Sequence, residues 1–211
     1  MHADIRQPRP ALLNSLLYAG AVIVSVVLMG CQTQHRFTPC CAGGARSTDM
    51  TQTSFYNGSS FQAETARQAY FDMMERFNYP ISAKLREDMW ATDFALGDFP
   101  KVGMGGIFWV NKQDKGYFAH EIFLLPGQMI VEHGHEDCDT CSAKHESWHV
   151  RHGSIFTFGE GTPTADLPVE LPQSQLPHIT VKHCEEVKAG DIAELNRVTA
   201  KHFMIAGPEG A

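Results

Sequence analysis

Two histidines separated by one residue are the first side chains in this sequence that could do chemistry together. His133 and His135 follow the run Met129–Val131, whose apolar and β-branched residues are typical of a strand. Side chains two residues apart in a strand point to the same face, so both imidazoles can bind one metal ion. A His-x-His pair also arises often by chance, and two ordinary strand histidines would need no metal. Further ligands at suitable positions would decide between these interpretations.

The residues around this pair resemble the two sequence motifs of the cupin superfamily. Gly127 precedes His133 by six positions, and Glu146 follows His135 after ten intervening residues, a longer spacer than the motif usually has. A second glycine, Gly153, completes the first motif. The second motif places a histidine after a turn that begins with glycine, and His202 takes that place, although two other positions of this motif depart from its usual pattern.

The cupin resemblance implies one divalent metal ion bound by His133, His135, Glu146 and His202. Three neutral imidazoles and one carboxylate suit Mn, Co, Fe, Ni or Zn, and such a set leaves coordination positions for a bidentate oxygen ligand. The type of ligand does not choose among these metals.

A second metal site is a weaker hypothesis. Cys138 and Cys141 lie in the spacer, and with His145 and His149 they could bind a structural zinc ion. The alternation of side chains turns His145 and His149 away from the Glu146 side, so two free thiols in a flexible loop are the preferred interpretation. A disulfide between the two cysteines is a further alternative.

Within the cupins, the sequence resembles the smaller bacterial D-lyxose isomerases over roughly residues 93–211. The resemblance lies in the segments Asp93–Gly97, Lys101–Gly103, Glu121–Gln128, Glu132–His135, Lys144–Glu146, Arg151–Gly153, His178–Val181, Lys201–Phe203 and Ala206–Ala211. It implies a manganese-dependent isomerase that interconverts D-lyxose and D-xylulose, or D-mannose and D-fructose, by moving a proton between C1 and C2 through an enediol. The metal would stabilise the developing enediolate and a carboxylate would carry the proton.

The same resemblance implies three catalytic residues, Lys144, Glu121 and Glu132. Lys144 would stabilise the enediolate or donate a hydrogen bond to O1 of the sugar, and the alternative is a solvated loop lysine. For Glu121 and Glu132 the alternative is a salt-bridged residue at the edge of the sheet. Trp148 shares a strand face with Glu146 and would form either an apolar wall for the sugar or part of the core, and the core is favoured.

The family continues past the equivalent of Ala211 with an apolar strand that carries another glutamate, so we expect a truncated barrel. That departure makes a sugar-binding cupin without turnover the main alternative. A cupin dioxygenase, which would need iron, is less favoured.

The elements that must position these residues are mainly β. Six runs separated by Gly and Pro predict an antiparallel cupin-type barrel, or jelly roll, over residues 97–211: Val102–Val110, Tyr117–Leu124, Met129–His133, Glu146–Phe158, His178–Cys184 and Thr199–Ala206. Residues 161–177 are predicted to form an exposed loop. Residues 59–96 are predicted as a helical head with one amphipathic helix within 61–77, opened by a capping box of Ser59 and Gln62, and a short helix within 82–90.

Residues 1–31 resemble a bacterial lipoprotein signal. Arg6 and Arg9 precede an uncharged, mostly apolar stretch from Pro10 to Gly30, and Cys31 follows. This pattern predicts a protein of the cell envelope that is lipidated at Cys31, with residues 32–58 as a linker. The alternatives are an uncleaved membrane helix and a translation start at Met50, which would give a cytoplasmic protein.

The composition limits the partners. A chain of 211 residues with 43% hydrophobic residues suits one globular domain, and its formal charge of −7 argues against nucleic acid, which requires clustered Lys and Arg. A small neutral molecule such as a sugar is the expected ligand. Membrane contact is expected only through the N-terminal anchor, and a homodimer is expected by analogy with other cupins.

Overall fold

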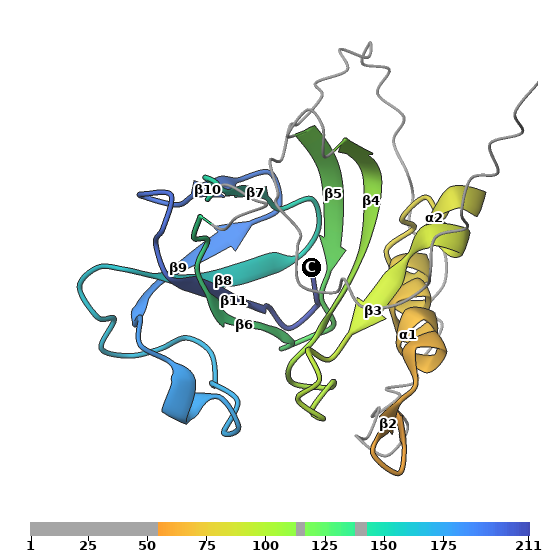
Figure 1. Ribbon diagram of the computed structural model, residues 1–211, viewed down its shortest axis with the longest axis horizontal. Helices are drawn as coiled ribbons and strands as arrows, with labels where there is room; N and C mark the ends of the chain where they lie inside the picture. Colours follow the sequence, from red (N-terminus) through yellow and green to blue (C-terminus); the bar gives the residue numbers. More distant parts are fainter. Residues whose placement is uncertain (1–54, 113–116, 138–142) are drawn as a thin grey trace, which may run out of the picture.

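The computed structural model describes residues 55–112, 117–137 and 143–211 (Figure 1). The predicted lipoprotein signal, the linker cysteines and the pair Cys138 and Cys141 lie outside these ranges. Within them, no helix combines the length and the apolar character that crossing a membrane requires.

The helical head contains two helices that follow a short hairpin of β1 (Tyr56–Asn57) and β2 (Ser60–Phe61). Helix α1 (Ala63–Arg76) buries Ala66, Ala69, Tyr70, Met73 and Met74, the spacing of one amphipathic face. Its N-cap, Gln62, makes no side-chain capping bond, so the predicted capping box is wrong. Helix α2 (Ala83–Asp88) is capped instead by Ser82, whose Oγ accepts a hydrogen bond from the Leu85 amide at 3.1 Å.

The β-strands form antiparallel sheets in two main layers. One sheet has the order β3 (Trp90–Thr92), β4 (Met104–Lys112), β5 (Tyr117–Phe123), and the other has the order β6 (Met129–His133), β11 (His202–Ala206), β8 (Ser154–Gly159), β9 (His183–Lys188). A separate pair joins β7 (Ser147–His149) to β10 (Ile192–Glu194). The predicted mainly β fold after a helical segment is confirmed, whereas hydrogen bonding among the described strands does not join these sheets into one closed barrel.

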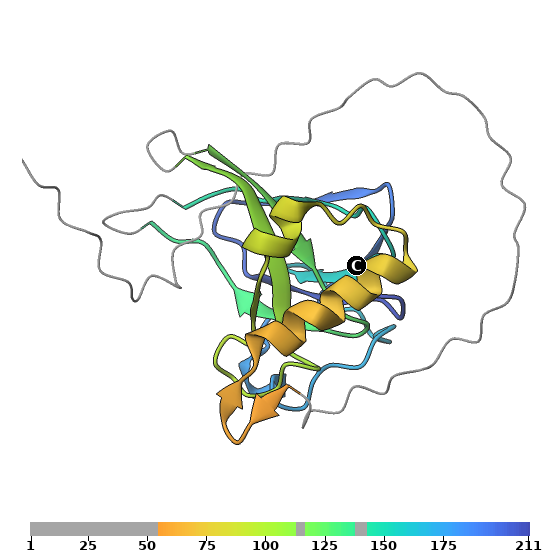
Figure 2. The same cartoon turned by 90° about the vertical axis from the view of Figure 1, so that its right-hand side faces the viewer.

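The helices cover one side of the three-stranded sheet, and the four-stranded sheet lies on its other side (Figures 1 and 2). One hydrophobic core, around Tyr70, Phe99 and Ile107, joins α1 to the three-stranded sheet. A second lies between the two sheets and includes Ile130 and Met204. A third packs the loop before β9 against the outer face of the four-stranded sheet.

Two predicted strands differ from the structure. The run Glu146–Phe158 forms two strands, β7 and β8, because the chain turns between them at Gly153, whose φ of +65° favours glycine. The run His178–Cys184 contains the end of a 3₁₀ turn (Leu176–His178) and irregular backbone, and β9 begins only at His183. Val181 is buried and Ile179 partly buried because this loop packs on the outer face of the sheet.

Candidate metal centre

The candidate metal centre begins with a distortion of strand β6. His133 pairs with His202 on β11, and Ile130 pairs with Met204, so three steps along β6 match two steps along β11. One extra residue in β6 is a β-bulge, which interrupts the regular alternation of side chains. His133 and Ile130 can therefore face the same side of the sheet, the side that bears the core between the two layers.

The four predicted ligands lie together. One nitrogen from each of His133, His135 and His202 and one oxygen of Glu146 all lie within 4.8 Å of one another. Ligand atoms that are each about 2.1 Å from one ion are separated by roughly 3 to 4 Å, so the cluster is close to a coordination geometry. His133 is the last residue of β6 and His135 lies two residues beyond it, Glu146 directly precedes β7, and His202 begins β11.

Hydrogen bonds orient two of the imidazoles. The Nδ1 atoms of His133 and His202 donate to the carbonyl oxygens of Val131 and Ala200, both at 2.8 Å, which leaves each Nε2 as the basic nitrogen. Nε2 of His202 and Nε2 of His135 are buried and make no aligned hydrogen bond to any described residue. Buried polar atoms without partners are costly, and a metal ion at this point would satisfy them. The residues present therefore fit a divalent cation.

The carboxylate of Glu146 carries the negative charge of the cluster. Its Oε2 lies 3.1 Å from Nε2 of His135 and 3.4 Å from Nε2 of His202. Burial opposes its ionisation, but contacts with these two imidazoles and the charge of Lys144 hold the pKa of Glu146 well below its usual range. Burial, together with the neighbouring His202, lowers the pKa of His133 to about 4. The cluster thus holds an ionised carboxylate and a neutral His133, the forms that bind metal.

Lys144 and Trp148 border this cluster. Nζ of Lys144 lies 3.3 Å from Oε1 of Glu146, and only 11% of its side chain is exposed, so it is not a solvated loop lysine. Burial lowers the pKa of the Lys144 ammonium, although Glu146 acts in the opposite direction. The Trp148 ring lies 5.2 Å from that of His202, and it is half-buried against the core between the sheets. Both interpretations of Trp148, wall and core, therefore have support.

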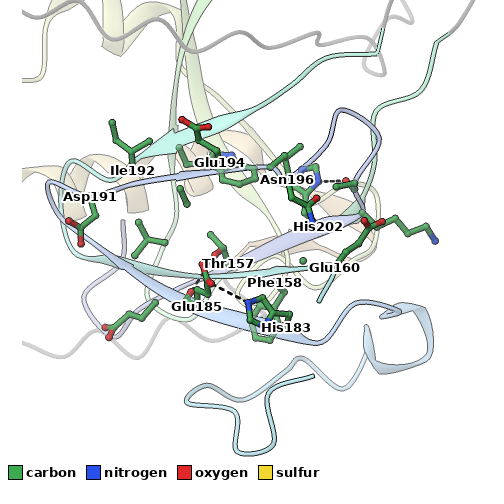
Figure 3. A pocket seen from close by; sticks show the side chains of 18 residues that line it. Thr157, Phe158, Glu160, His183, Glu185, Asp191, Ile192, Glu194, Asn196 and His202 are labelled. Atoms are coloured by element: carbon green, nitrogen blue, oxygen red, sulfur yellow. Dashed lines mark hydrogen bonds and ion pairs between the residues drawn. The ribbon is translucent and has the colours of Figure 1, made fainter. Parts of the chain in front are cut away.

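A cavity of about 620 Å³ opens beside His202, between β8, β9 and the β10 region (Figure 3). Carboxylates and polar groups line it, among them Glu185, Asp191 and Glu194, and Trp148 and His202 form part of its wall. His183 contacts Glu185 at 3.1 Å within the same cavity. Such a lining offers many hydrogen bonds to a neutral, hydroxyl-rich molecule and repels an anion.

The other two predicted catalytic residues lie in different surroundings. The Glu121 carboxylate accepts hydrogen bonds from Tyr79 Oη at 2.6 Å and Trp109 Nε1 at 2.9 Å, and it pairs with Arg151. The Glu132 carboxylate accepts bonds from the amide and hydroxyl of Thr180 and from the Val181 amide.

Neither glutamate belongs to the cluster of donor atoms. Glu121 contacts Tyr79, which lies in the helical head between α1 and α2, whereas Glu132 contacts the loop on the outer face of the four-stranded sheet. For the second zinc hypothesis, the structure shows only that His145 Nε2 donates to the Leu195 carbonyl and that His149 is exposed. Its two cysteines lie outside the described residues.

Sequence reasoning did not single out His120, the residue before Glu121. Side chains alternate along β5, so His120 lies on the opposite face of the strand from Glu121. The charges of Glu146 and Lys144 both act on its imidazole. The predicted strand 117–124 carried the signal that could have found it, because alternating side chains place His120 and Glu121 on opposite faces.

The fold and this cluster define a mainly β protein with a candidate centre of three histidines and one glutamate. No protein-family model matches the chain. It is 28% identical to a D-lyxose/D-mannose isomerase of Thermosediminibacter oceani over 145 residues, which are 69% of this chain and 78% of that protein. It is 29% and 28% identical to the D-lyxose ketol-isomerases of a Thermofilum species and Cohnella laeviribosi, each over 146 residues, 69% of this chain and 79% of those proteins. The predicted resemblance to D-lyxose isomerases is thus confirmed as homology.

Proposed function

We propose that this protein is a metal-dependent isomerase that interconverts an aldose and a ketose, of the D-lyxose and D-xylulose type. The observation that carries the proposal is the convergence of His133, His135, Glu146 and His202 within 4.8 Å in a chain homologous to D-lyxose ketol-isomerases. A cupin-type barrel built from the two sheets is part of the proposal, and the same homology supports it. D-Mannose is a second candidate substrate, because one relative carries it in its name.

Manganese is the proposed metal, held by the three Nε2 atoms and the Glu146 carboxylate. When bound, the cation would polarise O1 and O2 of the sugar and acidify the neighbouring carbon-bound proton. The cavity beside His202 would receive the rest of the sugar. Its carboxylate lining favours an uncharged sugar over a sugar phosphate.

Lys144 is the proposed partner of the sugar's O1. Its ammonium is held near the cluster by Oε1 of Glu146 at 3.3 Å, and its side chain is mostly buried. From this position Nζ can donate a hydrogen bond to an oxygen on which negative charge develops. The proton that moves between C1 and C2 returns to the sugar, so the reaction needs no oxidant or reductant.

A sugar-binding protein without turnover is the second candidate, and one observation favours it. Both glutamates that could have carried the proton, Glu121 and Glu132, use their carboxylates in hydrogen bonds away from the cluster. A site with four metal ligands and Lys144 but no separate base would bind a sugar and turn it over slowly.

The test is an isomerisation screen of the full chain loaded with Mn²⁺. D-Lyxose, D-mannose and D-xylulose are each incubated with the protein, and the products are separated by chromatography. We expect D-xylulose from D-lyxose, and none from the chelator-treated protein. If the metal-loaded protein converts none of these sugars, the isomerase proposal fails; tight binding of the same sugars would then identify the binding protein.

A further inference from the structure

His120 lies on the face of β5 that is turned away from the helices. Its neighbour Glu121 faces the helical side, where it contacts Tyr79 and Trp109. Strand β4 also has one face toward the helices and one face away from them: Gly105 lies against Tyr70 of α1, whereas Gly106 lies under His120. The next residue on the His120 face, Ile122, packs into the core between the two sheets. His120 therefore looks toward the layer that carries the metal ligands.

Aromatic rings fix the position of this imidazole. It stacks on Phe108 with ring centroids 4.5 Å apart and an interplanar angle of 14°, and on Trp90 at 5.5 Å and 28°. A Cβ atom at Gly106 would come within 2.8 Å of His120 Nε2, so only glycine leaves room for the ring there. A side chain clamped in this way has lost its rotamer freedom before any ligand arrives.

The His120 imidazole is also coupled to the metal centre. Burial lowers its pKa to about 4, and among the nearby charges Glu146 raises the pKa and Lys144 lowers it. At neutral pH the ring is thus uncharged, with one nitrogen as donor and the other as acceptor. His120 and Trp148 line a second cavity, of about 840 Å³, together with Met204 and with residues of the helical side such as Met73 and Glu121. Trp148 also borders the cavity beside His202, so a sugar that contacts His120 would extend past Trp148 from the first cavity into the second.

We propose that His120 contacts the substrate: it exchanges a hydrogen bond with a hydroxyl group of the sugar, from the wall opposite His133 and His202. This inference rests on the proposed function and adds the residue that fixes how the sugar lies on the metal. His120 is not one of the four clustered donors, so its role is to bind the ligand and not the ion. A neutral imidazole between aromatic rings suits a hydroxyl, which both donates and accepts.

The experiment measures binding of D-arabinitol, the polyol that results from reduction of D-lyxose and cannot isomerise. Calorimetric titrations use the Mn²⁺-loaded full chain, and metal content and far-UV circular dichroism are recorded for each variant. His120→Phe keeps the stack on Phe108 and Trp90 but removes both ring nitrogens. His120→Gln keeps a donor and an acceptor. His178→Phe makes the same change at an exposed histidine of the 3₁₀ turn and is the matched control.

We expect His120→Phe to raise the Kd about tenfold or more, with full metal content. His120→Gln should recover part of the loss, and His178→Phe should bind as the unaltered chain does. Unchanged affinity in His120→Phe overturns the inference, as does loss of metal in both His120 variants, since the residue would then support the ion. Failure of the unaltered chain to bind the polyol also overturns it.

The proposed function is tested separately on the unaltered chain with D-lyxose. If that chain binds D-arabinitol but does not convert D-lyxose, the isomerase proposal fails, and a raised Kd in His120→Phe still establishes His120 as a ligand contact. If it converts D-lyxose and His120→Phe does so with unchanged KM, the inference fails and the proposed function stands.

Discussion

His133 on β6 and His202 on β11 lie directly opposite each other in an antiparallel ladder, with ring centroids 4.2 Å apart. This pairing depends on the bulge in β6, because without the extra residue His133 would turn to the face that bears the loop before β9. The bulge has a second effect on Glu132, whose carboxylate meets Thr180 and Val181 of that loop. One backbone irregularity thus places the candidate metal ligand His133 and the neighbouring Glu132 on opposite faces of the sheet.

Glu132→Gln should destabilise the protein without weakening the metal centre. The substitution places an amide NH₂ near N–H groups that now donate to a carboxylate, and hydrogen bonds to charged groups contribute about 1.5 to 3 kcal/mol. Urea unfolding should show a loss of that size, whereas the Mn²⁺ affinity should stay within about twofold. Glu170→Gln, at an exposed position of the long loop, is the control. An unchanged free energy of unfolding together with a large loss of kcat would instead support the catalytic role predicted from the resemblance.

Lys144→Met should reduce turnover while metal remains bound. The change removes the charge near Oε1 of Glu146 and the donor proposed for O1. A positioned donor of this kind contributes about 100-fold or more to the rate, so kcat for D-lyxose should fall by that order. Lys182→Met, at an exposed site, should leave kcat unchanged. Equal kcat values for Lys144→Met and the unaltered chain would remove Lys144 from the reaction.

Trp148→Leu should weaken sugar binding more than metal binding. The indole lies between the two cavities and against His202, and aromatic contacts of this kind contribute about 0.5 to 1.5 kcal/mol beyond burial. The KM for D-lyxose should therefore rise by up to about tenfold, with metal content unchanged. Trp148→Phe should show a smaller increase because it keeps an aromatic face. If Trp148→Leu only lowers the melting temperature and KM stays the same, Trp148 belongs to the core alone.

The stability of the metal-free protein should decrease as the pH falls from 6.5 to 4. Burial lowers the pKa of His120 from its ordinary value to about 4, so the unfolded chain takes up a proton in this interval and the folded chain does not. The unfolded state is then favoured, by up to about 3 kcal/mol from this group. Chemical unfolding at several pH values measures the slope. His120→Phe should reduce the slope by about half between pH 6.5 and 4, because His133, whose pKa is also lowered to about 4, keeps its own contribution. An unchanged slope would contradict the lowered pKa of His120.

The four clustered donors could be predicted from the sequence because the spacing of His133, His135 and Glu146, and the place of His202 in a second motif, resemble the cupin pattern. The sheet face on which the neighbouring residues lie could not be predicted in the same way. Placing Glu121 and His120 on their separate faces requires knowing which side of β5 the helices cover. Placing Glu132, predicted as a catalytic residue, on the outer face requires the bulge in β6, and the residue types between 129 and 133 give no sign of that bulge.

The loop before β9 shows the same limit. Its apolar residues Ile179 and Val181 pack against the sheet from outside, and they alternate as strand residues do. Alternation of apolar residues indicates only that alternate side chains are buried. An extended loop that covers a sheet buries alternate side chains just as a strand within the sheet does. The order of helices before strands was predictable, because helical periodicity and the Gly and Pro punctuation of short strands are both local signals.

Metal retention by the unaltered chain, His133→Ala and Glu146→Gln tests the central claim most directly. Each protein is loaded with Mn²⁺, dialysed against a mild chelator, and analysed for metal per chain, with His178→Ala as the control at an exposed histidine. We predict about one ion per chain for the unaltered protein and the control, and loss of the ion from both ligand variants. Circular dichroism should show that Glu146→Gln keeps its fold, since it preserves volume and removes a buried charge. Full metal occupancy in both His133→Ala and Glu146→Gln would contradict the assignment of the metal centre and, with it, the proposed isomerase.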